Sequence, residues 1–131
     1  MPMIHSDPEY VEVTPELKEK FERFRQEHAN DPVGDVAQVV LYEDDDVRVW
    51  EMKLEPGEAS DLHTHEHEYV LVVMSGDVVA GITPKGHPVD PFIGKIPEQG
   101  NTVRVPKGNT EWAVNIGKKT YHEVLIELKH T

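Results

Sequence analysis

The sequence contains no cysteine and has few basic residues. Disulfides and thiolate metal sites are therefore excluded, and any bound metal ion must be held by nitrogen and oxygen atoms. The 13 Lys and Arg residues stand against 25 Asp and Glu residues, which gives a formal net charge of -12. Because such a surface repels phosphate groups, nucleic acids and anionic membrane surfaces are not expected partners.

The sequence also lacks long hydrophobic runs. No apolar segment approaches the ~20 residues that span a bilayer, and the first residues lack the basic flank and apolar run of a signal peptide. We therefore expect a cytoplasmic protein. The length of 131 residues suits one domain with one hydrophobic core.

One helix is predicted, near the start of the chain. Thr14 is a good N-cap and Pro15 suits the first helical position. Leu17, Phe21 and Phe24 then follow at spacings of four and three, so they lie on one helical face. We expect this helix to pack on the core without a role in chemistry.

The rest of the chain has the pattern of short strands separated by turns. Residues 84–100 contain several prolines and glycines and are expected to form one long hairpin connection. The strands are expected at residues 36–42, 47–54, 69–74, 78–82, 102–105, 111–116 and 120–128. This pattern predicts an all-β barrel or sandwich, with residues 1–35 as an N-terminal extension and residues 36–131 as the barrel domain.

Residues 69–74 are apolar on both faces of the expected strand. A strand with one face in water alternates between apolar and polar residues, so both faces of this one are expected to be covered. The cover is either the N-terminal helix or a second subunit, and we expect a homodimer.

Two histidines at His63 and His65 form the strongest candidate site. Residues two apart on an extended chain face the same way, so both imidazoles can approach one metal ion. They follow a Pro-Gly turn and precede the apolar strand, which places them at the edge of the core. A chance pair of histidines in a surface loop is the alternative.

Two segments together resemble the paired motifs of the cupin superfamily. The first motif is matched by Gly57, His63, His65 and Gly76, and the second by Gly100, Pro106, Gly108 and Asn115. The resemblance implies a cupin-type double-stranded β-helix, or jelly-roll barrel, that holds one divalent transition metal ion: Fe, Mn, Zn or Ni.

Two of the four usual cupin ligand positions differ in this sequence. Tyr69 stands where the family has glutamate, and Glu111 stands where it has the third histidine. The resemblance therefore carries over fully only for His63 and His65, and it places Glu111 as an oxygen ligand. Two histidines and one carboxylate are a competent set for such a metal.

The roles of Tyr69 and His67 stay open at this point. Tyr69 is our candidate catalytic residue, as a proton donor or substrate contact; the alternatives are a buried tyrosine with a satisfied hydroxyl, or a phenolate ligand. His67 shares the parity of His63 and His65 and is a candidate fourth ligand if the chain stays extended.

Three functions fit these residues. The first is a metal-dependent cupin-type enzyme, a dioxygenase, isomerase, decarboxylase or lyase, acting on a small organic acid or diketone. The second is a non-enzymatic module that binds a metal or metabolite. The third is a purely structural barrel. Fold does not decide between them.

Overall fold

A computed structural model describes all residues 1–131 as ten strands and one helix. In chain order they are β1 (Glu9–Val11), α1 (Pro15–Glu27), β2 (Val39–Glu43), β3 (Val47–Leu54), β4 (His63–Thr64), β5 (Glu68–Ser75), β6 (Val78–Ile82), β7 (Phe92–Lys95), β8 (Thr102–Val105), β9 (Thr110–Val114) and β10 (Tyr121–Leu128). The seven strands predicted from the sequence are present; β3, β6 and β8 have the predicted ends, and the other four have shifted ends. The strands β1, β4 and β7 were not predicted.

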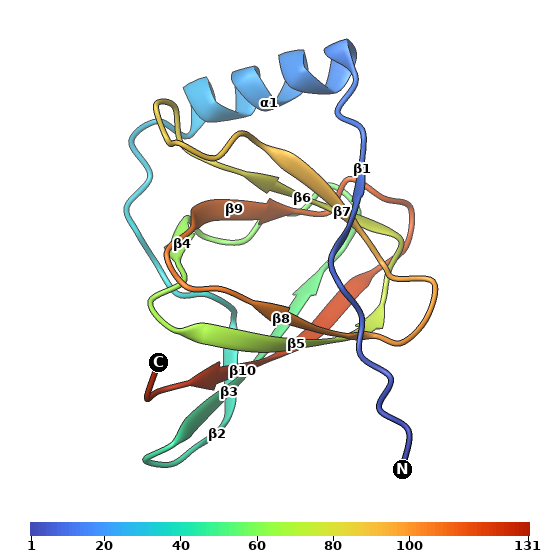
Figure 1. Cartoon of the computed structure of the whole chain (residues 1–131). Helices are drawn as coiled ribbons and strands as arrows, with labels where there is room; N and C mark the ends of the chain where they lie inside the picture. Colours follow the sequence, from blue (N-terminus) through green and yellow to red (C-terminus); the bar gives the residue numbers. More distant parts are fainter.

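The strands form two five-stranded antiparallel sheets that enclose a barrel interior (Figure 1). The first sheet has the order β1-β7-β6-β9-β4, and the second has the order β2-β3-β10-β5-β8. An all-β architecture with one short helix is therefore confirmed. The expected long connection at residues 84–100 is wrong in one respect: β7 forms inside it and pairs with β6. Pro91 and Pro97 flank this strand and do not interrupt its ladder.

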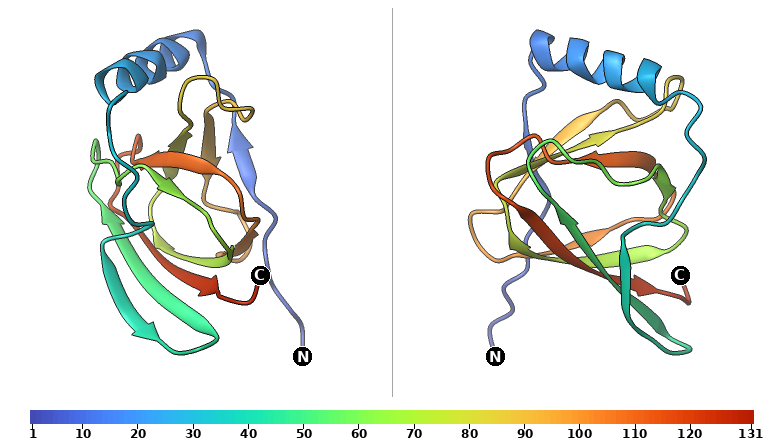
Figure 2. Two further views of the ribbon diagram at one scale, coloured as in Figure 1. Left: turned by 90° about the vertical axis from the view of Figure 1, so that its left-hand side faces the viewer. Right: turned by 180° about the vertical axis from the view of Figure 1, so that it is seen from behind.

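Helix α1 covers the outer face of the first sheet, as Figure 2 shows from two sides. The side-chain oxygen of Thr14 accepts a hydrogen bond from the Leu17 N–H at 3.3 Å, so the predicted N-cap is confirmed. Phe21 is 4% exposed and packs with Trp112 and Val114 of β9. The helix thus serves packing, and it has neither the length nor the apolar character needed to cross a bilayer.

The outer face of the second sheet has no such cover within the chain. Val70 and Val72 of β5 lie opposite Ile126 and Val124 of β10, and all four are only half-buried. Because α1 packs on the other sheet, the helix is not what covers the second face of β5. The expectation that the helix supplies this cover is therefore wrong.

The segment before the helix adds an edge strand to the first sheet. Within β1, Glu9 pairs with Lys95 and Val11 pairs with Ile93 of β7. The Ser6 N–H also donates a hydrogen bond to the Thr102 carbonyl at 2.9 Å. The N-terminal extension therefore takes part in the barrel wall, which its sequence pattern did not indicate.

Candidate metal centre

Three predicted ligands, His63, His65 and Glu111, come together in the barrel. In the pairing of β4 with β9, His63 lies directly opposite Glu111. One donor atom from each of the three residues lies within 4.8 Å of the others. His65 Nε2 is 3.1 Å from Glu111 Oε1, and the two imidazole rings lie 5.1 Å apart between centroids. His65 and Glu111 are 46 positions apart in the sequence, and the pairing of β4 with β9 brings them together.

The donor atoms of this cluster are enclosed but only partly satisfied. His63 is 3% and His65 4% exposed, and the Glu111 side chain is 13% exposed. Nδ1 of His65 and Oε2 of Glu111 are buried and have no hydrogen-bond partner. Buried polar atoms are rarely left unpaired. A divalent cation held by two imidazoles and one carboxylate would satisfy such a set, so these residues fit a metal ion.

The backbone fixes the tautomer of His63. Its Nδ1 lies 2.9 Å from the Asp61 carbonyl oxygen, which can only accept, so Nδ1 carries the proton. The lone pair is then on Nε2, which is free to bind a metal. Burial lowers the pKa of His63 below its ordinary value. The hydrogen bond to the Asp61 carbonyl raises this pKa, but its effect is smaller. Desolvation therefore keeps this imidazole in the neutral form that a ligand needs.

A glycine turn holds His65 beside β9. The Gly108 N–H donates to the His65 carbonyl at 2.7 Å, and the His65 N–H donates to the Asn109 carbonyl at 2.9 Å. Gly108 has a φ of 112°, a backbone conformation that residues with a Cβ rarely adopt. The glycine of the second motif thus allows the backbone contacts that place His65 opposite Asn109, which is two residues before Glu111.

Gly81 of β6 makes room for the Glu111 carboxylate. A Cβ built at Gly81 overlaps Oε2 of Glu111 and the ring of Phe92, closer than real atoms approach. Any side chain here would displace the carboxylate. Sequence reasoning did not single out Gly81, because a glycine within a strand gives no sign of which side chain it accommodates.

The cluster opens on a cavity of about 190 Å³ between the two sheets. This is smaller than the ~300–1,000 Å³ typical of sites for drug-sized ligands, so it suits a small molecule. The side chains around it are mostly apolar and come from both sheets and from the N-terminal segment, for example Tyr10, Met52, Leu71, Phe92, Ile96, Val103 and Leu125.

Tyr69 is buried beside the cluster but is not among the residues that line the cavity. It is 2% exposed, and its ring packs edge-on against His65 with centroids 5.0 Å apart. Burial, followed by the negative charge of Glu127, raises the pKa of its hydroxyl well above the ordinary value. The phenol is therefore neutral at neutral pH, and a phenolate ligand is not favoured.

His67 is not brought into the cluster. Its Nδ1 lies 3.2 Å from the Thr131 carbonyl oxygen and its Nε2 lies 3.5 Å from Glu127 Oε2. The side chain is 27% exposed, far more than those of His63 and His65. The structure thus groups three of the four predicted ligands.

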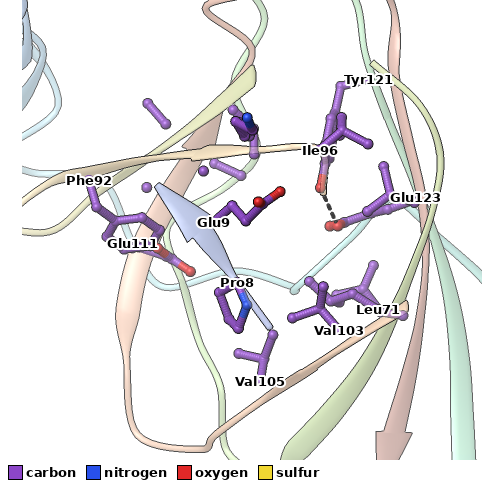
Figure 3. Close-up of a pocket in the computed structure, with 18 of the residues that line it drawn as sticks. Pro8, Glu9, Leu71, Phe92, Ile96, Val103, Val105, Glu111, Tyr121 and Glu123 are labelled. Carbon is purple, nitrogen blue, oxygen red and sulfur yellow. Dashed lines mark hydrogen bonds between the residues drawn. The ribbon is translucent and has the colours of Figure 1, made fainter. Parts of the chain in front are cut away.

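Two further cavity residues were missed by sequence reasoning. Tyr121 and Glu123 of β10 both line the cavity, and the Tyr121 hydroxyl donates to Glu123 Oε2 at 2.6 Å. Figure 3 shows this pair across the cavity from Glu111. Burial raises the pKa of Glu123 to about 7, although the Tyr121 hydrogen bond acts in the opposite direction. The sequence pattern gave no signal for them, because the opposite face of β10 carries the apolar residues Val124, Ile126 and Leu128.

Similar solved structures agree with this architecture. A cupin domain from Bordetella pertussis Tohama I is 22% identical, with a TM-score of 0.60 over 72% of this chain and 98% of that one. A conserved protein with a double-stranded β-helix domain from Klebsiella pneumoniae is 20% identical, with a TM-score of 0.54 over 79% and 85%. A cupin superfamily protein from Desulfitobacterium hafniense is 18% identical, with a TM-score of 0.51 over 74% and 80%.

Sequence comparison alone does not reach this result. No protein-family model matches the chain, and no curated protein matches it. The structural likeness and the two motifs agree on one architecture, so the resemblance stated above is confirmed at the level of fold. The chain has the double-stranded β-helix fold of the cupins.

Proposed function

We propose that this protein is a metal-dependent enzyme of the cupin type that acts on a small organic molecule. The observation that carries the proposal is the cluster of His63, His65 and Glu111, whose donor atoms lie within 4.8 Å of one another. Nδ1 of His65 and Oε2 of Glu111 are buried without a partner, and all three residues line the cavity.

The residues of the chain have separate tasks in this proposal. His63, His65 and Glu111 would hold a divalent ion, Fe, Mn, Zn or Ni, and the ion would polarise an oxygen atom of the substrate. Three protein ligands leave coordination positions open, as a catalytic site requires. The apolar walls, with Leu71 and Val103 among them, exclude water and strengthen electrostatic interactions inside the cavity.

Metal analysis of the purified, untagged protein tests the ligand set. After reconstitution we expect close to one equivalent of a transition metal, and His63→Ala and Glu111→Gln are each expected to weaken binding. His130→Ala is the matched control, because its side chain is 74% exposed. His67→Ala tests the sequence-based prediction of a fourth ligand. Full metal occupancy in His63→Ala would contradict the proposed centre.

Turnover separates an enzyme from a binding module. The metal-loaded protein is assayed for consumption of oxygen and for conversion of small acids, hydroxyketones and diketones, with and without chelator. Conversion that chelator abolishes supports the enzyme. Retained metal together with bound but unconverted compounds would instead favour the non-enzymatic module, because the scaffold serves both roles.

We further propose that two copies of the chain pair through the outer face of the second sheet. Val70, Val72, Val124 and Ile126 form a continuous apolar strip, and the Arg104–Glu68 ion pair supplies both charges at its edge. A two-fold interface must be self-complementary, and an apolar strip with charges of both signs at its edge meets that condition.

The oligomeric state in solution tests this pairing. Light scattering is expected to give twice the chain mass of 14.9 kDa for the wild type. Ile126→Glu places a charge in the strip and is expected to give the single-chain mass, while His130→Ala leaves the dimer intact. A wild type that is monomeric across a concentration series would refute the pairing.

A further inference from the structure

Strand β10 turns two carboxylates toward the barrel interior, where strands usually carry apolar residues. Tyr121, Glu123, Leu125 and Glu127 are buried, whereas the residues between them are only half-buried. A buried carboxylate is costly unless hydrogen bonds or charges compensate for lost water. Glu127 has such a partner, because the Trp50 indole N–H donates to its Oε1 at 2.9 Å. This hydrogen bond accounts for the burial of Glu127 as part of the core.

Glu123 has far less compensation. It is 4% exposed, and the only hydrogen bond to its side chain is the one from the Tyr121 hydroxyl to Oε2. The other carboxylate oxygen has no partner in the chain. Leu71 and Val103 lie beside it in the cavity (Figure 3). A half-satisfied carboxyl in an apolar wall indicates a functional group more than a structural one.

The cationic side chains of the cavity do not compensate for Glu123. Lys95 Nζ lies 3.4 Å from Glu98 and Arg104 Nη2 lies 2.9 Å from Glu68, so both are engaged with surface carboxylates. The Arg104 side chain is also 56% exposed. Apart from the proposed metal ion, whose charge Glu111 and an ionised Glu123 would offset, the cavity holds no free cation, so an uncharged compound fits it better than a carboxylate or phosphate.

We propose that Glu123 is a catalytic acid–base residue that transfers a proton to and from a carbon next to a substrate carbonyl, and that the substrate is a small uncharged hydroxyketone or diketone. This rests on the proposed metal-dependent function, and it names the residue that handles the proton. Glu123 faces the same cavity as the metal cluster but is not part of it.

The proton transfer involves only the substrate and the Glu123 side chain. The unprotonated carboxylate of Glu123 takes the proton from the carbon, and the electron pair of the broken C–H bond stays on the substrate as an enolate. The protonated carboxyl then returns a proton to the same or the neighbouring carbon. No oxidant or reductant is needed. In the metal-free protein, burial raises the pKa of Glu123 to about 7, so the carboxyl can both accept and return a proton near neutral pH.

Tyr121 acts as a positioning residue. Its hydroxyl holds one oxygen of Glu123 at 2.6 Å, which leaves the other oxygen turned to the substrate. The same hydrogen bond lowers the pKa of Glu123, so its loss is expected to raise the pKa further.

The proton-transfer rate is expected to rise with pH as Glu123 loses its proton. Several other charged or titratable groups face the same cavity, and each can influence this profile. They are His63, His65, Glu111, Glu9, Lys95 and Tyr121; Arg104 borders the cavity, but its side chain pairs with Glu68 on the outer face of the second sheet. Glu111 raises the pKa of Glu123 and His65 lowers it. The variants below are therefore compared over the whole profile and not at a single pH.

Hydrogen–deuterium exchange tests the proposal directly. Hydroxyacetone and 2,3-butanedione are incubated with metal-loaded protein in deuterated water, and loss of the C–H signals is followed by proton NMR. Glu123→Gln is expected to slow the exchange at least about 100-fold, with metal content unchanged. Tyr121→Phe is expected to keep exchange but to move its pH midpoint upward. Glu127→Gln is the matched control, since it alters a buried carboxyl of the same strand.

The outcomes separate this inference from the proposed function. A wild type that binds no metal refutes the proposed function itself. A wild type that binds metal and exchanges neither probe, or a Glu123→Gln variant that exchanges as fast as the wild type, overturns the role of Glu123. Infrared spectra of the metal-free protein give a second readout: the protonated-carboxyl band is expected to fade as pH rises through neutrality in the wild type and to be missing in Glu123→Gln.

Discussion

Replacement of Glu123 by glutamine is expected to make the metal-free protein more stable at alkaline pH. The folded state raises the pKa of this carboxyl from an ordinary 4.5 to about 7. It therefore holds the proton more tightly than the unfolded chain does, and the free energy of unfolding falls as pH rises through this range. At about 1.4 kcal/mol per pKa unit, the loss amounts to about 3 kcal/mol. Glutamine does not ionise, so the variant avoids this loss.

Urea denaturation across a pH series measures this effect. The stability of Glu123→Gln relative to the wild type is expected to grow by about 2–3 kcal/mol between about pH 5 and about pH 8. The protein is kept free of metal with chelator, because a bound cation would favour the carboxylate. The lowered pKa of His63 affects both proteins alike and cancels in the difference. A stability difference independent of pH would show that Glu123 is not desolvated as the structure indicates.

Two further predictions concern packing. Gly81→Ala is expected to lower metal affinity about 10–100-fold, because the new methyl group displaces the Glu111 carboxylate. The control Gly94→Ala, where the nearest atom is 3.8 Å from the added Cβ, is expected to bind metal normally. Both affinities are measured by competition with a chelating dye, and equal values would contradict the role of Gly81. Trp50→Phe removes the donor to Glu127 and is expected to reduce the free energy of unfolding by about 1–3 kcal/mol; an unchanged urea midpoint would count against a structural role for that hydrogen bond.

The paired histidines and Glu111 could be found from the sequence because motif spacing encodes their position. His63 and His65 are two apart on one strand, and the Pro-x-Gly turn ending at Gly108 sets the start of β9. The meeting of Glu111 with the histidines depends on the pairing of β4 with β9, which no local pattern reveals. The resemblance to a known fold supplied that non-local information.

Glu123 could not be recognised because β10 reverses the usual rule of strand patterning. Alternation normally places apolar residues inside and polar residues outside. Here Glu123 faces the cavity, while Val124 and Ile126 face outward. Only the register with β3 and β5 shows which parity is inside. Such reversals are expected where a site requires a polar group in a core.

The edge strand β1 gives the cavity a wall that can change independently of the metal cluster. Pro8, Glu9 and Tyr10 border the cavity, yet they reach it from a segment joined to the first sheet only through β7. Substitutions there can reshape the volume offered to a ligand while the β4–β9 ladder stays intact. Diversification of ligand preference among relatives with this architecture would thus be easiest at the beginning of the chain.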